Sequence, residues 1–401
     1  MNHASAAGPL RNVTVLDLSR VLSGPYCTMQ LADMGARVIK IERPGAGDDT
    51  RAWGPPFVEG ESAYFLSINR NKESVTLNFK HPEGRRLLDA LIARADVLVE
   101  NFRPGTLDDM ALGYEALHAK HPRLIYTSIS GFGHTGPLRE RAGYDAVLQG
   151  EAGIMSVTGP AGGPGYKVGV AIADLAAGLF ATQGTLLALY ERERSGRGQH
   201  VDIAMLDSVA ALLTYQAGIY FTTGAPPSRL GNAHPTVAPY ETFQASDGDI
   251  VLAAGNDELW RRFCRVAGLD AYAADPRFVT NGDRVRNYGA LRPIVAEAFR
   301  RRTRAEWIGL LNEAGIPAGP VRDLHEVLTD PQLLAREMVH TLPHIAAGPV
   351  RVLGIPVKLS DTPGAVRAAP PALGEHTEAV LTRDLGLAAA DVAALRAAGV
   401  V

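Results

Sequence analysis

The stretch Val13-Thr-Val-Leu-Asp-Leu-Ser-Arg-Val-Leu-Ser-Gly-Pro-Tyr-Cys-Thr-Met-Gln-Leu-Ala-Asp-Met-Gly-Ala-Arg-Val-Ile-Lys-Ile41 decides the fold. Two short apolar runs rich in β-branched residues, at 13–18 and 37–41, enclose a helical pattern from about Tyr26 to Met34. Two strands joined through a helix form a βαβ unit, in which the strands are parallel. The stretch therefore predicts the start of a parallel sheet covered by helices.

The same alternation continues downstream. Strand patterns at 97–99 and 124–129 are accompanied by a helical pattern at 83–93, and a long apolar helix follows at about 171–194. A further strand and helix are expected between 199 and 219. This pattern predicts an α/β fold with a doubly wound, mainly parallel sheet.

Changes in composition divide the chain into three parts. Residues 1–221 form the first part of a large domain, and a linker-like stretch begins near Thr222. Residues 225–325 are expected to form a smaller domain that contains a hairpin near 240–254 and several helices. The Pro- and Gly-rich segment 330–401, with closing helices at 374–384 and 389–398, is expected to return and complete the large domain.

The composition is typical of a protein that binds or converts a small molecule. The 401 residues carry a net charge of −3 with no basic cluster, which gives no footprint for nucleic acid or for a membrane surface. Two cysteines, Cys27 and Cys264, fit a reducing compartment. The stretch from Met1 to Pro9 lacks the pattern of a secretory leader, so we expect a cytoplasmic protein.

Asp174 is the most informative single residue. It lies in the apolar stretch 168–180, where an unpaired carboxylate is costly to bury. If the helix begins near Ala171, Asp174 lies in its first turn, where free N–H groups and the helix dipole favour the ionised form and hold its pKa low. Asp174 is thus either a structural first-turn residue or a nucleophile.

Other motifs carry weaker signals. Gly131–Gly136 matches G-x-G-x-x-G, but Pro137 follows at once and no helical pattern comes next, which argues against a dinucleotide site. Two histidine pairs lack the companion ligands of a metal centre, so no metal is expected; they are His118 with His121 and His340 with His344.

Arginines recur in the loops that follow the predicted strands. Arg20, Arg43 and Arg103 each lie in such a loop, and ligands of open α/β sheets bind at the carboxyl ends of the strands. Taken singly, each is more typical of a surface ion pair. Together they indicate an anionic ligand, because guanidinium groups suit phosphates and carboxylates.

Nine sequence blocks resemble the class III CoA-transferases of the CaiB/BaiF family, and they span nearly the whole chain. The blocks lie at Leu16–Pro25, Leu31–Pro44, Asn69–Ser74, Asn101–Gly105, Ser130–Pro137, Ala142–Asp145, Ile172–Gly178, Ser195–Gln199 and Leu373–Thr377. The resemblance implies a Rossmann-like large domain, a smaller α/β domain, and two chains interlocked in a homodimer. It also identifies Asp174 as the nucleophile that carries CoA as an aspartyl-CoA thioester.

The resemblance further implies CoA contacts. No tightly bound cofactor is expected, since the CoA thioester is the substrate. A family position that carries arginine is Asp109 here, so we assign its phosphate role to Arg103. The stretch 231–237 corresponds to a glycine-rich covering loop but has few glycines. The other expected CoA-binding residues are Val21, Ser23, Arg43, Leu77, Lys80, Asn101 and Phe102.

Within the family, the stretches 45–57 and 231–240 are similar to succinate-hydroxymethylglutarate CoA-transferases and their bacterial relatives that use dicarboxylates. This implies transfer from an acyl-CoA, with succinyl-CoA as the first donor to try, to a dicarboxylate of the glutarate or hydroxymethylglutarate class. Arg20, Arg51 and Arg70 are candidates for binding the distal carboxylate.

Two alternatives stay open. In the related 2-methylacyl-CoA racemases a histidine acts as acid and base at the position of Tyr144, and a phenol is a poor base at neutral pH. We therefore place Tyr144 among the substrate-binding residues. The other alternative is a protein that binds acyl-CoA without turnover.

Overall fold

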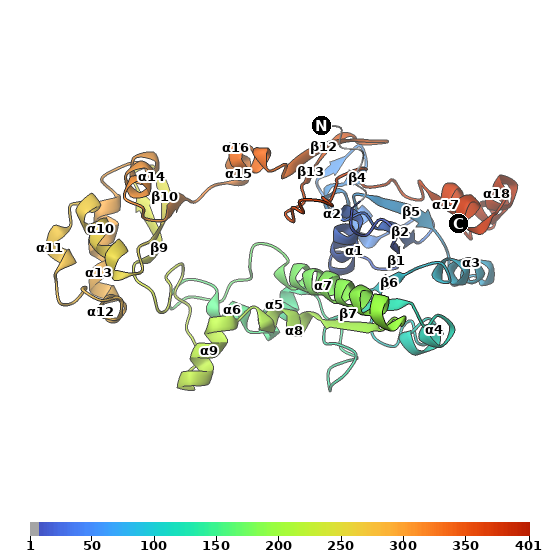
Figure 1. Ribbon diagram of the computed structural model, residues 1–401, viewed down its shortest axis with the longest axis horizontal. Coiled ribbons are helices and arrows are strands. Elements are labelled where there is room, and N and C mark those ends of the chain that lie inside the picture. The colour runs from blue at the N-terminus through green and yellow to red at the C-terminus, as the bar shows by residue number, and fades with distance from the viewer. Residues whose placement is uncertain (1–7) are drawn as a thin grey trace. The chain divides into compact units, whose positions relative to one another are not determined.

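The computed structural model describes residues 8–401, so most of the stretch inspected for a leader lies outside the described residues. The chain divides into two compact units (Figure 1). The large unit contains the chain up to Ile154, Lys167–Ala217 and Pro331–Val401, and the small unit contains Met155–Tyr166 and Gly218–Asp330. The segment 155–166, which the sequence placed in the large domain, thus groups with the small unit.

Six parallel strands form the sheet of the large unit, in the order β5-β2-β1-β6-β7-β8. Counted along the chain this is 3-2-1-4-5-6, the order of Rossmann folds, and the order reverses between β1 and β6. The expected parallel α/β sheet is confirmed. Its strands are β1 (Thr14–Asp17), β2 (Arg37–Glu42), β5 (Lys72–Thr76), β6 (Val97–Glu100), β7 (Ile125–Ser130) and β8 (His200–Ala204).

Helices cover both faces of this sheet because neighbouring strand residues point to opposite sides. Val15, Val97 and Ile125 belong to the core shared with α1 (Ser23–Asp33), α7 (Ile172–Ser195) and α8 (Met205–Ala211). Leu16, Leu98 and Tyr126 belong to the core on the opposite face. That face is covered by α3 (Pro82–Ile92), α4 (Tyr114–Lys120), α17 (Thr377–Leu385) and α18 (Ala389–Ala397).

The helix α7 begins and ends where the sequence predicts. It starts at Ile172, and Gly196 ends it in the left-handed region at φ 73°. By length and hydropathy α7 resembles a membrane span, but it packs against α1, β7 and β8 within the core. Close approach to α1 requires Gly178, since a Cβ there would lie 2.7 Å from the Ser23 carbonyl oxygen.

The C-terminal segment adds a hairpin that the sequence did not predict. β12 (Val339–His344) and β13 (Gly348–Leu353) pair antiparallel and pack on α2 (Ala63–Ile68). The predicted closing helices are confirmed as α17 and α18. The end of the chain is fixed on the large unit, where the Asn78 N–H donates to the Val400 carbonyl at 2.7 Å.

The small unit has a three-stranded antiparallel sheet and an aromatic core. Trp260, Phe263, Phe299 and Trp307 pack beneath β9 (Tyr240–Ala245), β10 (Gly248–Ala253) and β11 (Ala318–Pro320). The β9–β10 hairpin confirms the one predicted near 240–254. The small unit also contains the helices α10 (Asp257–Ala267), α11 (Asp270–Ala273), α12 (Asn281–Arg286), α13 (Tyr288–Phe299), α14 (Arg304–Glu313) and α15 (Leu324–Leu328).

The short elements complete the chain. They are the 3-10 helix η1 (Asp49–Ala52), β3 (Phe57–Val58), β4 (Glu61–Ser62), α5 (Asp145–Glu151), α6 (Ile154–Val157), α9 (Thr214–Thr223) and α16 (Pro331–Ala335).

Candidate active site

Asp174 lies in the first turn of α7, as predicted, and its carboxylate is mostly withdrawn from solvent. The hydroxyl and backbone of Ser23, at the start of α1, hydrogen-bond to it and lower its pKa. The close packing of α1 on α7 at Gly178 is what brings these two helix starts together. Asp174 and Ser23 therefore form the centre of the site.

A second carboxylate, Asp145 in the first turn of α5, controls the start of α7. Its Oδ1 accepts the Ala173 N–H at 2.8 Å, and its Oδ2 accepts from the Gln149 side chain at 2.8 Å. Gln149 is fully buried and in turn accepts the Val168 N–H at 2.8 Å. These contacts tie the residues before α7 to α5.

The expected low pKa of Asp174 is wrong. Burial, reinforced by the nearby charge of Asp145, raises the pKa of the Asp174 carboxyl to about 7. The helix start does not offset this: Asp145 takes the Ala173 N–H, and the bonds from Ser23 lower the pKa of Asp174 by less than burial and Asp145 raise it. Asp174 is a poorly solvated carboxylate, and such a group is more nucleophilic than one surrounded by water.

The loops after β1 and β6 meet at the point where the strand order reverses. The Asn101 side chain accepts the Arg20 N–H at 2.8 Å and donates to the Arg20 carbonyl at 2.6 Å. Its Nδ2 also lies 3.4 Å from the Ser23 hydroxyl. Asn101 thus joins the two loops beside Asp174, in the crevice where ligands of such sheets bind.

A cavity of about 500 Å³ opens along the same ends of β1, β2, β5 and β6. Arg20, Arg43 and Lys80 contribute positive charge to its wall, and Leu77 and Phe102 contribute apolar surface. The wall also contains Lys40, Glu42 and Asp48, whose side chains are buried in ion pairs. Its size and charge suit the phosphates and adenosine of a CoA thioester. The structure thus brings together five of the predicted residues, while Val21, Ser23 and Asn101 lie in the adjoining loops.

Of the three arginines predicted for the distal carboxylate, only Arg20 is accessible. Its side chain is 48% exposed, and its guanidinium pairs with Asp49 at 2.9 Å and lies 5.7 Å from the centre of the Phe102 ring. Arg51 is bound to Glu42 at 2.7 Å, and the buried Arg70 pairs with Asp33. The charges of Arg51 and Arg70 are therefore already neutralised within the protein.

Tyrosines mark the surroundings of Asp174. Tyr144, the residue before α5, is 69% exposed. No sequence pattern points to Tyr64 on α2, yet burial and then the charges of Asp174 and Asp145 raise the pKa of its phenol to about 12. Tyr64 is therefore near both carboxylates. It packs edge-on against Trp53, with 5.1 Å between the ring centres.

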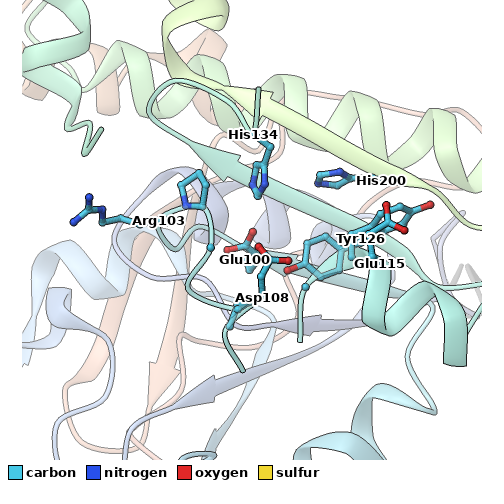
Figure 2. Close-up of a pocket in the computed structure, with 12 residues that line it drawn as sticks. Glu100, Arg103, Asp108, Glu115, Tyr126, His134 and His200 are labelled. Carbon is cyan, nitrogen blue, oxygen red and sulfur yellow. The ribbon is translucent and has the colours of Figure 1, made fainter. Parts of the chain in front are cut away.

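A smaller cavity of about 190 Å³ lies on the other side of the segment after β6. Figure 2 shows Glu100, His134 and His200 converging on it, while the Arg103 guanidinium extends away from them. Burial raises the pKa of the Glu100 carboxyl to about 8. Arg103 donates to the Glu140 carbonyl at 2.7 Å, so the structure does not bring it to the larger cavity. The stretch 231–237 lies in the small unit, and its covering role stays a prediction.

Comparison with known proteins gives a consistent result. The model of CoA-transferase family III matches residues 10–377. Succinyl-CoA:glutarate CoA-transferase of Mus musculus is 42% identical over 98% of this chain and 90% of its own length. Acetyl-CoA:oxalate CoA-transferase of Acetobacter aceti is 44% identical over 89% and 90%. A CAIB/BAIF family protein of Brucella suis, 43% identical, superimposes with a TM-score of 0.85 over 94% of this chain and 100% of that one.

Proposed function

This chain belongs to CoA-transferase family III, and we propose that it moves CoA from succinyl-CoA to a short dicarboxylic acid of the glutarate class. The observation that supports this most directly is that Asp174 contacts Ser23, at the end of the same loop whose Ser19 and Arg20 line the large cavity. Relatives from two kingdoms of life carry dicarboxylate acceptors in their names, glutarate in one and oxalate in the other.

The proposed chemistry passes CoA through Asp174. The carboxylate attacks the thioester carbonyl of succinyl-CoA, giving an aspartyl-succinyl anhydride and CoA thiolate. The thiolate attacks the aspartyl carbonyl and releases succinate, which leaves an aspartyl-CoA thioester. A carboxylate of the acceptor then repeats the two steps in reverse, and Asp174 is regenerated as the acyl-CoA product leaves.

The environment of Asp174 fits this exchange. A carboxylate with a pKa of about 7 is largely ionised at slightly alkaline pH, yet little water competes for it. The Ser23 N–H and hydroxyl lie beside it, where they are placed to stabilise the charge that develops on the anhydride oxygens. Both features serve a carboxylate that must form and break acyl bonds repeatedly.

Arg20 is proposed to select the dicarboxylate. It is the exposed arginine of the three candidates, and its backbone is held by Asn101 in the loop that leads to Ser23. Its ion pair with Asp49 is partly exposed, so a substrate carboxylate is able to replace it at small cost. Tyr144 and Tyr64 complete the proposed substrate wall.

The test of the function is an acceptor screen. The purified protein is mixed with succinyl-CoA and, separately, glutarate, hydroxymethylglutarate, oxalate and a monocarboxylate, and CoA esters are followed by mass spectrometry. Glutaryl-CoA or a related ester should form with equimolar succinate, and hydroxylamine should trap a modified Asp174. Asp174→Ala should lose several orders of magnitude in rate. Exchange of an α-proton without an acceptor acid would instead show a racemase, and binding without turnover would leave only a CoA-binding protein.

Arg20→Gln tests the selection of the acceptor. Losing a charge-assisted contact should weaken transition-state binding of glutarate by roughly 2 to 4 kcal/mol and lower kcat/KM accordingly. The kcat/KM for a monocarboxylate of equal length should fall much less. Arg43→Gln is the matched control, since Arg43 lines the same cavity and pairs with the same Asp49. Equal losses for both acids in Arg20→Gln would assign Arg20 to CoA binding instead.

A homodimer is also proposed. Leu179, Leu186, Leu187 and Tyr190 are 41–67% exposed and recur at helical spacing along α7. A row of exposed apolar side chains on the surface of a protein marks an interaction surface. A second copy of the chain is the occupant that the resemblance to interlocked dimers supports.

A further inference from the structure

The loop between β1 and α1 contains a strained residue. Val21 has φ 68°, in the left-handed region that β-branched residues rarely adopt. Such strain persists only when surrounding contacts hold it, and it concentrates at functional sites. The loop carries Ser23 at its end, which contacts Asp174, so its conformation bears directly on the reacting carboxylate.

Two buried charged side chains, Lys40 and Asp48, bind the backbone of this loop. Lys40 on β2 is fully buried and donates to the Ser19 carbonyl at 2.8 Å, and it pairs with Asp48 at 2.9 Å. The other oxygen of Asp48 accepts the Val21 N–H at 3.2 Å and is fixed by two bonds from Thr50. The pair therefore contacts the backbone on both sides of Arg20.

Both members of the pair are charged at neutral pH. Burial opposes ionisation, but the Lys40 ammonium lowers the pKa of Asp48 to about 2, and Asp48 raises the pKa of Lys40. A buried ion pair is a weak source of stability compared with apolar packing. What Lys40 and Asp48 provide that apolar side chains would not is a set of directed bonds to the loop backbone.

We propose that Lys40 and Asp48 are positioning residues for CoA transfer, holding the Ser19–Ser23 loop in the strained conformation that sets Ser23 against Asp174. This inference rests on the proposed function. Neither side chain is placed to touch the reacting atoms. Lys40 and Asp48 lie at the wall of the large cavity, but their side chains are 1% and 0% exposed, whereas Arg43 and Lys80 line the same cavity and are untouched. The loss of the pair should let Val21 relax and displace Ser23, which weakens the transfer steps more than the binding of CoA.

The decisive variant is Lys40→Met combined with Asp48→Asn, which removes the pair without leaving an unpaired buried charge. We expect kcat for transfer from succinyl-CoA to fall at least tenfold, with KM for succinyl-CoA changed less than threefold. The matched control is Arg192→Met with Asp96→Asn. That pair, 3.0 Å apart in the same unit, lies where β6 begins, away from the loop. It should lose less than twofold in kcat.

A second measurement separates positioning from general destabilisation. Val21→Gly relieves the strain, because glycine adopts positive φ freely. Val21→Gly should raise kcat in the Lys40→Met/Asp48→Asn variant relative to its effect in the wild type. The ratio of the two effects should be at least threefold. If the double variant does not fold, Asp48→Ala alone serves. It removes the bond from the Val21 N–H, while the charges of Asp17 and Glu42 remain near Lys40, and it should show the same coupling to Val21→Gly.

The outcomes are distinct. A loss of kcat no larger than that of the control pair, or no coupling to Val21→Gly, would overturn the positioning role. Mass spectrometry measures how fast the Asp174–CoA thioester forms, and this rate reports the first half of the reaction in every variant. If the wild-type protein forms no such thioester, the proposed function fails; if it does and the double variant forms it equally fast, only this inference fails.

Discussion

At the scale of single residues, the reactivity of Asp174 depends on Asp145. Burial, and then the charge of Asp145, which also takes the Ala173 N–H, raise the pKa of Asp174, the proposed nucleophile, to about 7. The ionised form is the reactive one. The rate should therefore fall as the pH drops below about 7, where Asp174 becomes protonated.

Asp145→Asn should move this acid limb to lower pH. The asparagine oxygen is still able to accept from Ala173, although the bond from Gln149 is lost, and the repelling charge is gone. The measurement is kcat/KM from about pH 5 to about pH 9. Glu151→Gln is the control, because it removes a charge at the other end of α5 and should leave the limb in place. An unmoved limb in Asp145→Asn would mean that the charge of Asp145 does not act on Asp174.

The same pKa predicts a conflict between stability and activity. The folded protein keeps Asp174 protonated up to about pH 7, whereas the ordinary pKa of this carboxyl is 3.8. Between these two pH values the folded state therefore binds more protons than the unfolded chain. Stability therefore declines as pH rises through this range, and the full loss is present above it. Asp174→Asn should be more stable than the wild type by ~2 to 4 kcal/mol at alkaline pH and about equal to it near pH 4.

Denaturant unfolding at both pH values measures this difference. The activity of the variant should be lost at the same time, because the amide is no nucleophile. A variant that is no more stable at alkaline pH would show that Asp174 is better solvated than its surroundings indicate.

At the scale of elements, the sequence predicts most strands of the parallel sheet but misses β5, which buries polar residues, and the β12–β13 hairpin. β5 reads Lys72-Glu-Ser-Val-Thr76, with only one apolar residue, yet it is an edge strand of the parallel sheet. Lys72 and Ser74 are buried there because each has a partner, Asp17 and Glu42. Such pairings join residues far apart in the chain, so no local pattern reveals them.

The site shows the same division. Asp174, Arg20, Ser23 and Asn101 are predicted from the sequence, since all four lie in blocks that resemble the family and Asp174 also lies in an apolar helix start. Asp145 and Tyr64 were missed as partners of Asp174, because only the packing of α5 and α2 near the start of α7 brings them close. The raised pKa of Asp174 has the same origin, since it depends on the burial of the carboxyl and on the nearby charge of Asp145.

Gly178→Ala tests whether the α1–α7 contact sets the site. A Cβ would lie 2.7 Å from the Ser23 carbonyl oxygen and 3.0 Å from the Tyr26 ring, so the helices must separate. We expect a destabilisation of ~1 to 3 kcal/mol and a fall in kcat. Gly309→Ala in α14 is the control, since its Cβ meets open space and should stabilise the helix by up to ~1 kcal/mol. Thermal unfolding and kcat are the measurements, and an unchanged kcat would separate helix packing from catalysis.

At the scale of the whole molecule, the chain leaves one unit and comes back to it. Most of the small unit is inserted between Ala217 and Pro331, and Met155–Tyr166 adds to it. The returning segment supplies α17, α18 and a C-terminal end that reaches the large cavity through Gly399. Buried Val400 and Val401 complete the core beneath that cavity. The last residues of the chain are therefore part of the wall of the proposed CoA site, although they are the most distant in sequence from β1.

The exposed stripe on α7 connects this architecture to assembly. Leu187 is 61% exposed and Tyr190 is 67% exposed, on the helix whose first turn carries Asp174. If a second copy covers this stripe, Leu187→Asp should shift the protein from dimer to monomer, because burying an unpaired carboxylate costs several kcal/mol. Ile345→Asp, an equally drastic change at a 77% exposed residue between β12 and β13, should leave the dimer intact. Sedimentation velocity measures the change. A wild-type protein that sediments as a monomer, or a Leu187→Asp variant that stays dimeric, would show that the stripe on α7 is not the surface through which two chains associate.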